Sequence, residues 1–599
     1  MFKSIRNKIV FVTLFAMSAL FGCSNSEEES ASSGAIAAAE PLLSYVPANS
    51  PYVFASIAPL PDDVFDKLEP KIDRILQSYE VLLQEIVSMA TAELAAVNMD
   101  GADGADGADG TAVEDSEQEE ASKAIAIIGE LSSLMSVEGL RGAGFARESR
   151  GVFYGNGLLP VLRMEVTDGA LFEAALTNIE DLAGEKMDIA TIAGNTIRYA
   201  ATDAVKVLIA ILDQQVVVSI APASFSDAQL GELLGFTAPS SNIISSGVLQ
   251  SISTQYGFND YFVGYVDIES IVNTVSGTAS GLDAELLASA NDQEDLSDIC
   301  RAEIRSMGGI APRLVAGYTD VSAERFDSQV VLELRDDIAA DLTGLTAAVP
   351  GLGGDPGGLI SFGLSLDILA MRNFYEARLD ALEADPFECE LFAELQAGVA
   401  QGRIALQQPT PPMVYDFRGF VGVIQNIEGL DMTSQMPPTS VEGQFLLAMN
   451  NAPALVSFGT MMSPELAGLD LQSDGEPVQL DLPQAQSFGG DVYVAMTDNA
   501  LAMSVGDGAE TELSGMLSAD AEDNGLFFSF SMDAARYYAF MGEAIAAAEP
   551  DDKTPMSPEF RAAMQEMMLG IADIYERMSV DLRFTSDGIV IESEVTLGD

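Results

Sequence analysis

The chain has 599 residues, of which 48% are hydrophobic and 20% are charged, a balance typical of a folded protein and not of a disordered acidic tail. Its 92 acidic residues outweigh 28 basic residues, giving a formal net charge of −64. Such a surface repels nucleic acid, because no basic patch can displace counterions from phosphates. The length is enough for two domains of ordinary size.

The chain contains no histidine, and this absence excludes several classes of enzyme. Ser-His-Asp catalysis, Cys-His catalysis and histidine-ligated zinc, copper or iron sites all need this side chain. The sequence also lacks the G-x-S-x-G, S-x-x-K and Gly-Lys patterns of hydrolases and phosphate-binding loops. Carboxylate-dependent enzymes such as glycosidases remain open, but no pair stands out among 92 acidic residues. We therefore name no catalytic residue and expect no cofactor.

The first residues predict an exported lipoprotein. Three basic residues precede an apolar run from residue 9 to residue 21, which suits a signal peptide and is too short for a membrane span of about 20 residues. The run ends in Leu20-Phe21-Gly22-Cys23, which resembles the bacterial lipobox. The resemblance implies that residues 1–22 are removed and that Cys23 carries the lipid that anchors the protein.

The residues after Cys23 predict where the body lies. Ser24 stands where an aspartate would retain a lipoprotein in the inner membrane, so the resemblance favours the outer membrane, with the body facing the periplasm. Residues 23–40 are predicted to form a flexible tether that holds the body roughly 20–25 Å from the bilayer. The expected partners are the membrane, through the anchor, and another envelope protein, but no nucleic acid.

A first α+β domain is predicted over residues 41–350. Helical patterns run from Asp62 to about Ala96 and from Glu120 to Met135, with an acidic Asp-Gly-Ala linker at 98–120 between them. The repeat places carboxylates at Asp100, Asp103, Asp106 and Asp109. Carboxylates are ligands for Ca²⁺, but the spacing is not that of an EF-hand, and a solvated linker is the favoured interpretation.

A short unit recurs along the chain, consisting of an apolar strand, an aspartate and a helical pattern. The four aspartates are Asp168, Asp267, Asp367 and Asp533. An aspartate at a helix N-terminus accepts a hydrogen bond from a free backbone N–H, which stabilises the helix by about 1 kcal/mol. We therefore interpret the four residues as helix caps and not as an acidic site.

The order of units predicts an internal duplication. A strand at 213–220 and another at 498–505 each precede a helical pattern, and each half ends in a β-hairpin, at 314–334 and 580–595. The Gly-rich segment 351–358 is the predicted linker to a second α+β domain over residues 359–599. The fold expected is α+β, with two related domains built from antiparallel sheets covered by amphipathic helices.

A long helix is predicted near the C-terminus, from Pro558 to Met578. Its methionines Met564, Met567 and Met568 continue a helical apolar stripe, so packing is favoured over binding of Cu(I). Cys300 and Cys389 remain after lipidation of Cys23, and an even number of cysteines in an oxidising compartment predicts a disulfide between them.

Four segments resemble uncharacterised proteobacterial periplasmic lipoproteins built from a domain of unknown function. They are residues 43–54, 389–395, 450–455 and 473–478. The resemblance implies no activity and carries over no site residue. We therefore expect a lipid-anchored envelope protein that acts as a non-catalytic binding or assembly module. The alternatives are a carrier of an apolar ligand and a carboxylate-dependent glycan hydrolase.

Overall fold

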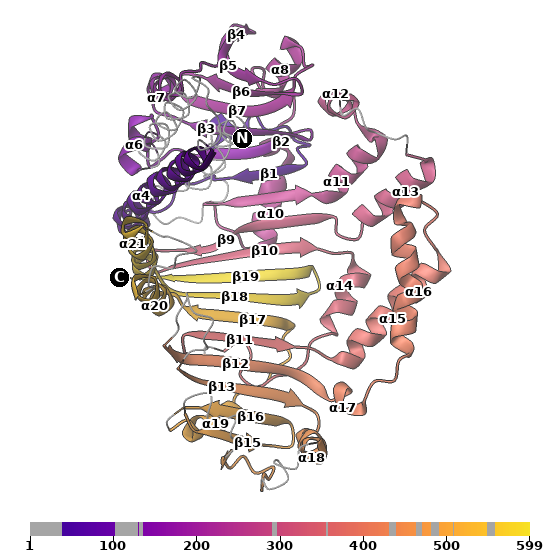
Figure 1. Cartoon of the computed structure of the whole chain (residues 1–599). Helices are drawn as coiled ribbons and strands as arrows, with labels where there is room; N and C mark the ends of the chain where they lie inside the picture. The colour runs from indigo at the N-terminus through magenta and orange to yellow at the C-terminus, as the bar shows by residue number, and fades with distance from the viewer. Residues whose placement is uncertain are drawn as a thin grey trace.

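The computed structural model describes residues 39–101, 130, 134, 136–289, 296–354, 357–429, 439–462, 470–480, 490–506, 508–547 and 557–598. Helices and strands are mixed, as expected, but the strands form one antiparallel sheet of 19 strands instead of several sheets (Figure 1). From one edge to the other the order is β4 (Asp188–Ile192), β5 (Asn195–Ala201), β6 (Val205–Ile211), β7 (Gln215–Pro222), β3 (Leu159–Glu165), β2 (Gly151–Asn156), β1 (Tyr52–Ala55), β8 (Val263–Asp267), β9 (Arg313–Val321), β10 (Arg325–Glu333), β19 (Gly588–Leu597), β18 (Tyr575–Thr585), β17 (Leu526–Asp533), β11 (Ile360–Ser365), β12 (Phe417–Glu428), β13 (Ser440–Met449), β16 (Ala500–Val505), β15 (Val492–Met496) and β14 (Val478–Gln479).

The sheet continues across the predicted domain boundary. Strand β10 pairs with β19 along its whole length, from Arg325 opposite Thr596 to Glu333 opposite Gly588. The segment before β11 packs on the second arm of the sheet: Val349 and Leu352 join the hydrophobic cluster of β12, β13 and β16. Pairing between β10 and β19 therefore joins the two arms, which we define as the strands from β4 to β10 and from β19 to β14.

The predicted helix caps are confirmed. Asp168 accepts a hydrogen bond from Ala170 N–H at the start of α7 (Gly169–Ala183), and Asp267 does so from Ser270 N–H at α11 (Ile268–Asn273). Asp367 caps α15 (Ile368–Ala384) through Ala370 N–H, and Asp533 accepts from Arg536 N–H in α20 (Ala534–Ala547). The strand–aspartate–helix unit is therefore a local folding signal.

Helices cover both faces of the first arm near its outer edge. The helices α3 (Glu40–Leu43), α8 (Asp227–Leu233), α9 (Ile243–Ser246) and α10 (Val248–Tyr256) bury one face in the largest core cluster. The helices α7 and α6 (Val137–Gly142) bury the other face over β3, β6 and β7. The ordered body includes the end of the predicted tether, because Ala39 is fully buried.

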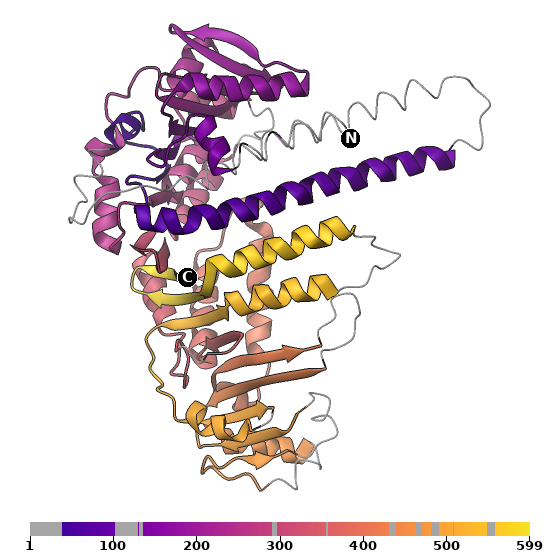
Figure 2. The ribbon, with the colours of Figure 1, turned by 90° about the vertical axis from the view of Figure 1, so that its left-hand side faces the viewer.

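Three long helices lie at one end of the central strands and run outward side by side (Figure 2). They are α4 (Asp62–Gly101), α20 and α21 (Pro558–Ile574). Helix α4 confirms the predicted helix from Asp62, whereas the predicted helix 120–135 lies largely outside the described residues. The predicted helix 558–578 is wrong at its end, because β18 begins at Tyr575 and Met578 pairs with Met532 and Val595.

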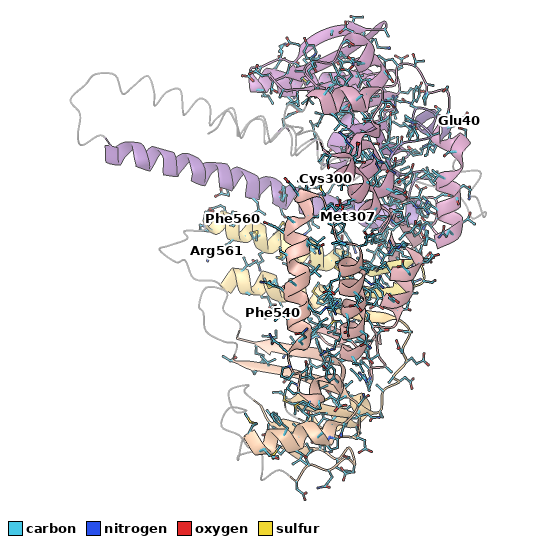
Figure 3. The ribbon with its side chains drawn as sticks, turned by 90° about the vertical axis from the view of Figure 1, so that its right-hand side faces the viewer. Glu40, Cys300, Met307, Phe540, Phe560 and Arg561 are labelled. Atoms are coloured by element: carbon cyan, nitrogen blue, oxygen red, sulfur yellow. A yellow bond between two sulfur atoms is a disulfide. The ribbon has the colours of Figure 1, made fainter. Side chains whose placement is uncertain are left out.

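The helices that the disulfide connects lie at the opposite ends of the strands. Cys300 lies in α13 (Asp298–Gly308) and is labelled in Figure 3. It is bonded to Cys389, which lies between α15 and α16 (Ala393–Gln407), with the Cα atoms 4.8 Å apart. The predicted disulfide is thus confirmed, and it joins the segment between β8 and β9 to the segment between β11 and β12. The remaining helices are α12 (Leu282–Ser289), α14 (Asp336–Thr343), α17 (Pro412–Tyr415), α18 (Ala452–Met462) and α19 (Glu510–Leu517), with the short turns η2 (Thr274–Thr278) and η3 (Glu390–Phe392).

Candidate binding face

Most residues predicted for anchoring or metal binding lie outside the described part of the chain. These are Cys23, Asp103, Asp106 and Asp109; Asp100 lies in α4, but its side chain is not described. Within the described ranges, no group of three or more acidic or cysteine side chains is placed to hold a metal ion. No helix in the same ranges combines the length and apolar character needed to cross a membrane.

One hollow of about 550 Å³ lies beside the start of α7. Its charged lining residues include Asp168, Glu173 and Arg198. Arg198 is 8% exposed and donates hydrogen bonds to Glu173 and, at 2.6 Å, to Glu180, while Asp168 caps α7. Hydrogen bonding to Glu173 is the main cause that raises the pKa of Arg198. The charges of Asp168, Glu173 and Arg198 are therefore used within the protein.

The register of the central strands separates their side chains into two faces. Residues directly opposite each other in an antiparallel pair project from the same face, and neighbours along a strand project from opposite faces. On β19, Glu592 and Glu594 therefore lie on one side, while Ile591 and Val595 lie on the other. We call the first side the polar face and the second side the apolar face.

Ion pairs and serine hydroxyls occupy the polar face of the central strands. Arg583 on β18 donates to Glu592 on β19 at 2.8 Å and to Asp581 at 2.7 Å. The hydroxyls of Ser361 and Ser531 lie 2.8 Å apart on β11 and β17. Groups of this kind are stable in contact with water.

The apolar face of the six central strands, β9, β10, β19, β18, β17 and β11, has the opposite composition. Its large apolar residues are Leu314, Phe326, Val330, Leu332, Ile589, Ile591, Val595, Met578, Val580, Leu582, Phe528, Phe530, Met532, Ile360, Phe362 and Leu364. Ser328 and Ser593 are opposite each other in the register and interrupt it. No paired position on this face of β9, β10, β19, β18, β17 or β11 holds a charged residue.

Aromatic side chains extend the apolar face into both arms. A row of ring contacts with centroids 5.6–6.5 Å apart crosses from β2 to β10 through Phe153, Tyr52, Phe54, Phe262, Tyr318 and Phe326. Phe362, Phe420 and Phe445 form a similar row across β11, β12 and β13. Phe54 and Phe362 lie over Gly264 and Gly422, where a Cβ would collide with each ring. These glycines let the rings lie against the neighbouring strand.

The apolar face of the central strands remains partly exposed. Val315, Val331 and Val590, on the other side of the same strands, are 0–5% exposed and belong to the main core. On the apolar side, Ile591 is 37% exposed, and only Phe584 and Leu597, at the two ends, are buried among the described residues of these strands. No residue of this face on the six central strands belongs to a described core cluster.

No family model, curated protein or solved structure matches this chain. The face therefore has to be interpreted from its own residues. Sequence reasoning missed it, although a signal was present in Phe528-Ser529-Phe530-Ser531-Met532, where phenylalanine alternates with serine. Such alternation is typical of a strand with one apolar and one polar face.

Proposed function

We propose that this protein is a non-catalytic binding module of the bacterial cell envelope, and that the apolar face contacts its ligand. The observation that carries the proposal is a face without charge at its paired positions, extending from β2 to β13, in a chain whose net charge is −64. A face that stays in contact with solvent would be expected to carry some of the 92 acidic side chains.

The size of the face supports the same proposal. Its eleven strands, at roughly 4.8 Å between neighbours, extend over about 48 Å. Contiguous exposed apolar patches of more than a few hundred Å² are rare in monomeric proteins and are typical of interaction sites. A ligand that covers the face would remove this apolar surface from water, which is favourable by roughly 25 cal/mol per Å².

The proposed envelope location rests on the signal-peptide pattern and on the disulfide. A bond between Cys300 and Cys389 is typical of proteins in an oxidising compartment such as the periplasm. With Cys23 as the lipid anchor, Cys23→Ser should accumulate as precursor or leave the membrane fraction. Normal processing and membrane fractionation of the variant would show that the anchor lies elsewhere.

We also propose that the module arose by duplication about the β10–β19 pair. Outward from β10 the strands are β9, β8, β1, β2, β3, β7, β6 and β5, and outward from β19 they are β18, β17, β11, β12, β13, β16, β15 and β14. The first half has one additional strand, β4, beyond β5. When β4 is left out, each position has the same rank along its own half of the chain, which supports two related halves. In an experimental structure, superposition of residues 150–340 on 355–599 should match β7 with β16 and the two hairpins with each other; unrelated topologies would end this proposal.

Binding of an apolar fluorescent dye tests the proposed function directly. Phe530 and Ser529 are neighbours on β17 that project from opposite faces. The full chain should bind the dye, Phe530→Glu should reduce binding several-fold, and Ser529→Glu should leave it unchanged. Circular dichroism checks that both variants fold. Equal dye binding by the two folded variants would contradict a ligand site on the apolar face.

The carrier alternative is the second candidate, and one observation favours it: the apolar face offers very few hydrogen-bonding side chains. The hydrolase alternative has no comparable support, since Glu173 and Glu180 accept hydrogen bonds from Arg198. Asp168, another carboxylate that lines the same hollow, is already a helix cap.

A further inference from the structure

We infer that the ligand of the apolar face is the acyl chains of membrane phospholipid, an inference that rests on the proposed binding function. Three properties of the face bear on the chemistry of its occupant: its hydrogen-bonding groups, its dimensions and its charge. Taken together, these properties favour hydrocarbon chains over a protein surface or a second copy of this chain.

Hydrogen-bonding groups are scarce on the apolar face. Its polar side chains at paired positions belong to Ser328, Ser593, Tyr52, Tyr318 and Tyr575. The Tyr52 hydroxyl already donates to the carbonyl of Leu158 at 3.2 Å, and the strand backbones are paired in the sheet. A protein partner would require about one hydrogen bond per 100–200 Å² of interface, whereas hydrocarbon requires none.

The dimensions of the face suit acyl chains. Along β17, the apolar positions run from Phe528 to Met532, a length of about 13 Å at roughly 3.3 Å per residue. The acyl layer of one bilayer leaflet is about 15 Å thick, half of a hydrocarbon core of about 30 Å. A chain lying along the strands would therefore be covered over most of its length, and several chains fit side by side across the sheet.

The charge of the face and of the whole chain favours phospholipid over free fatty acid as the source of these acyl chains. No paired position on the apolar face carries a basic side chain that would bind the carboxylate of a free fatty acid. The net charge of −64 also repels such an anion, and it repels a second copy of the chain. A zwitterionic phospholipid avoids both costs, because its chains lie on the face while its headgroup stays in water at the strand ends.

Site-specific photo-crosslinking in living cells tests the inference on the full-length protein. A photoreactive phenylalanine analogue is placed at Phe530 or Ile591 on the apolar face and, as the matched control, at Ser529 on the polar face. The expected result is a phospholipid adduct, identified by mass spectrometry, from Phe530 and Ile591 and at least tenfold less from Ser529.

The other outcomes overturn the inference in distinguishable ways. A crosslink from Phe530 to another protein, or to a second copy of this chain, would leave a binding module whose ligand is not phospholipid. A fatty-acid adduct without a phospholipid adduct would show that the bound chains belong to free fatty acid and not to phospholipid. Equal labelling from Phe530 and Ser529, together with dye binding that Phe530→Glu does not reduce, would overturn both the inference and the proposed function.

Discussion

The strands β3, β6 and β7 differ from β10, β17, β18 and β19 in what covers them. On β6, Leu208 packs on one face and Ile209 on the other, and both are at most 2% exposed because helices lie on both sides. On β18, Arg583 lies on one face and Leu582 on the other, and both remain partly exposed. We call these regions the covered strands and the open strands.

The comparison separates two reasons for an apolar side chain in a strand. In the covered strands both faces are apolar because helices of the same chain exclude water from both. In the open strands the polar face carries ion pairs and joins the main core at Val331 and Val590, whereas no residue of the apolar face belongs to a described core cluster. This contrast supports the proposal that a ligand covers the apolar face of the open strands.

The largest expected effect comes from the disulfide that spans the open strands. These strands contribute little core, so the two arms of the sheet depend on links at the ends of the strands. The Cys300–Cys389 bond is such a link and closes a loop with a sequence separation of 89. Replacing both cysteines by serine should lower the free energy of unfolding by about 4–5 kcal/mol on the chain-entropy model. Urea unfolding of oxidised wild type and the variant measures it; equal stabilities would show that this link does not matter.

A matched pair of leucines tests the comparison itself. Leu208→Ala, in the covered strands at 0% exposure, should cost about 2–5 kcal/mol of unfolding free energy, because it leaves a cavity in a closed core. Leu582→Ala, on the apolar face of the open strands, should cost about 1 kcal/mol, because part of the side chain stays in contact with water and it belongs to no described core cluster. Urea midpoints measure both; similar losses would mean that the apolar face is already covered.

Local signals made much of the fold predictable. An aspartate before a helical pattern predicts its own cap, as at Asp367, and Asp587-Gly588 predicts the tight turn of the last hairpin, because both depend on neighbouring residues. The disulfide followed from the cysteine count. The end of α21 did not, because Met578 continues a helical stripe and only its pairing with Met532 and Val595 makes it a strand residue.

The single sheet and the apolar face could not be predicted in the same way. Alternation around Phe530 states that one face of a strand is apolar, but not whether a helix covers it. The joining of two arms depends on which strand lies beside β10, and nothing within Arg325–Glu333 identifies β19 as that neighbour. Burial and long-range pairing are properties of the whole chain, so the candidate site needed the structure.

A smaller effect is expected at the other end of the open strands. Arg74 on α4 forms ion pairs with Glu566, at 2.9 Å, and with Asp573 on α21, and their side chains are 43–56% exposed. Exposed pairs contribute about 0–1 kcal/mol, so Arg74→Ala should lower stability by less than about 1 kcal/mol. The loss should disappear at about 1 M salt, where the Debye length falls to about 3 Å. Lys186→Ala, which removes an exposed pair with Asp181, is the control. A loss that persists at high salt would point to packing by the Arg74 stem.

The smallest effect concerns pH, at the helix that joins the two arms. Hydrogen bonding to Arg335 lowers the pKa of Asp337, in the first turn of α14, from 3.8 to about 2. The two side chains are 2.5 and 3.0 Å apart at their two contacts. Because the folded state has the lower pKa, the pair stabilises the fold at pH above about 4, and this contribution is lost as the pH falls from about 4 to about 2. Asp337→Asn should therefore be slightly less stable than wild type at pH 5–7. This difference in stability should shrink as the pH falls from about 4 to about 2 and should vanish below about 2. Urea midpoints at each pH measure the difference, and an NMR titration of the Asp337 carboxyl measures its pKa. A pKa near 3.8, or a difference independent of pH, would mean that Arg335 does not hold this carboxylate in solution.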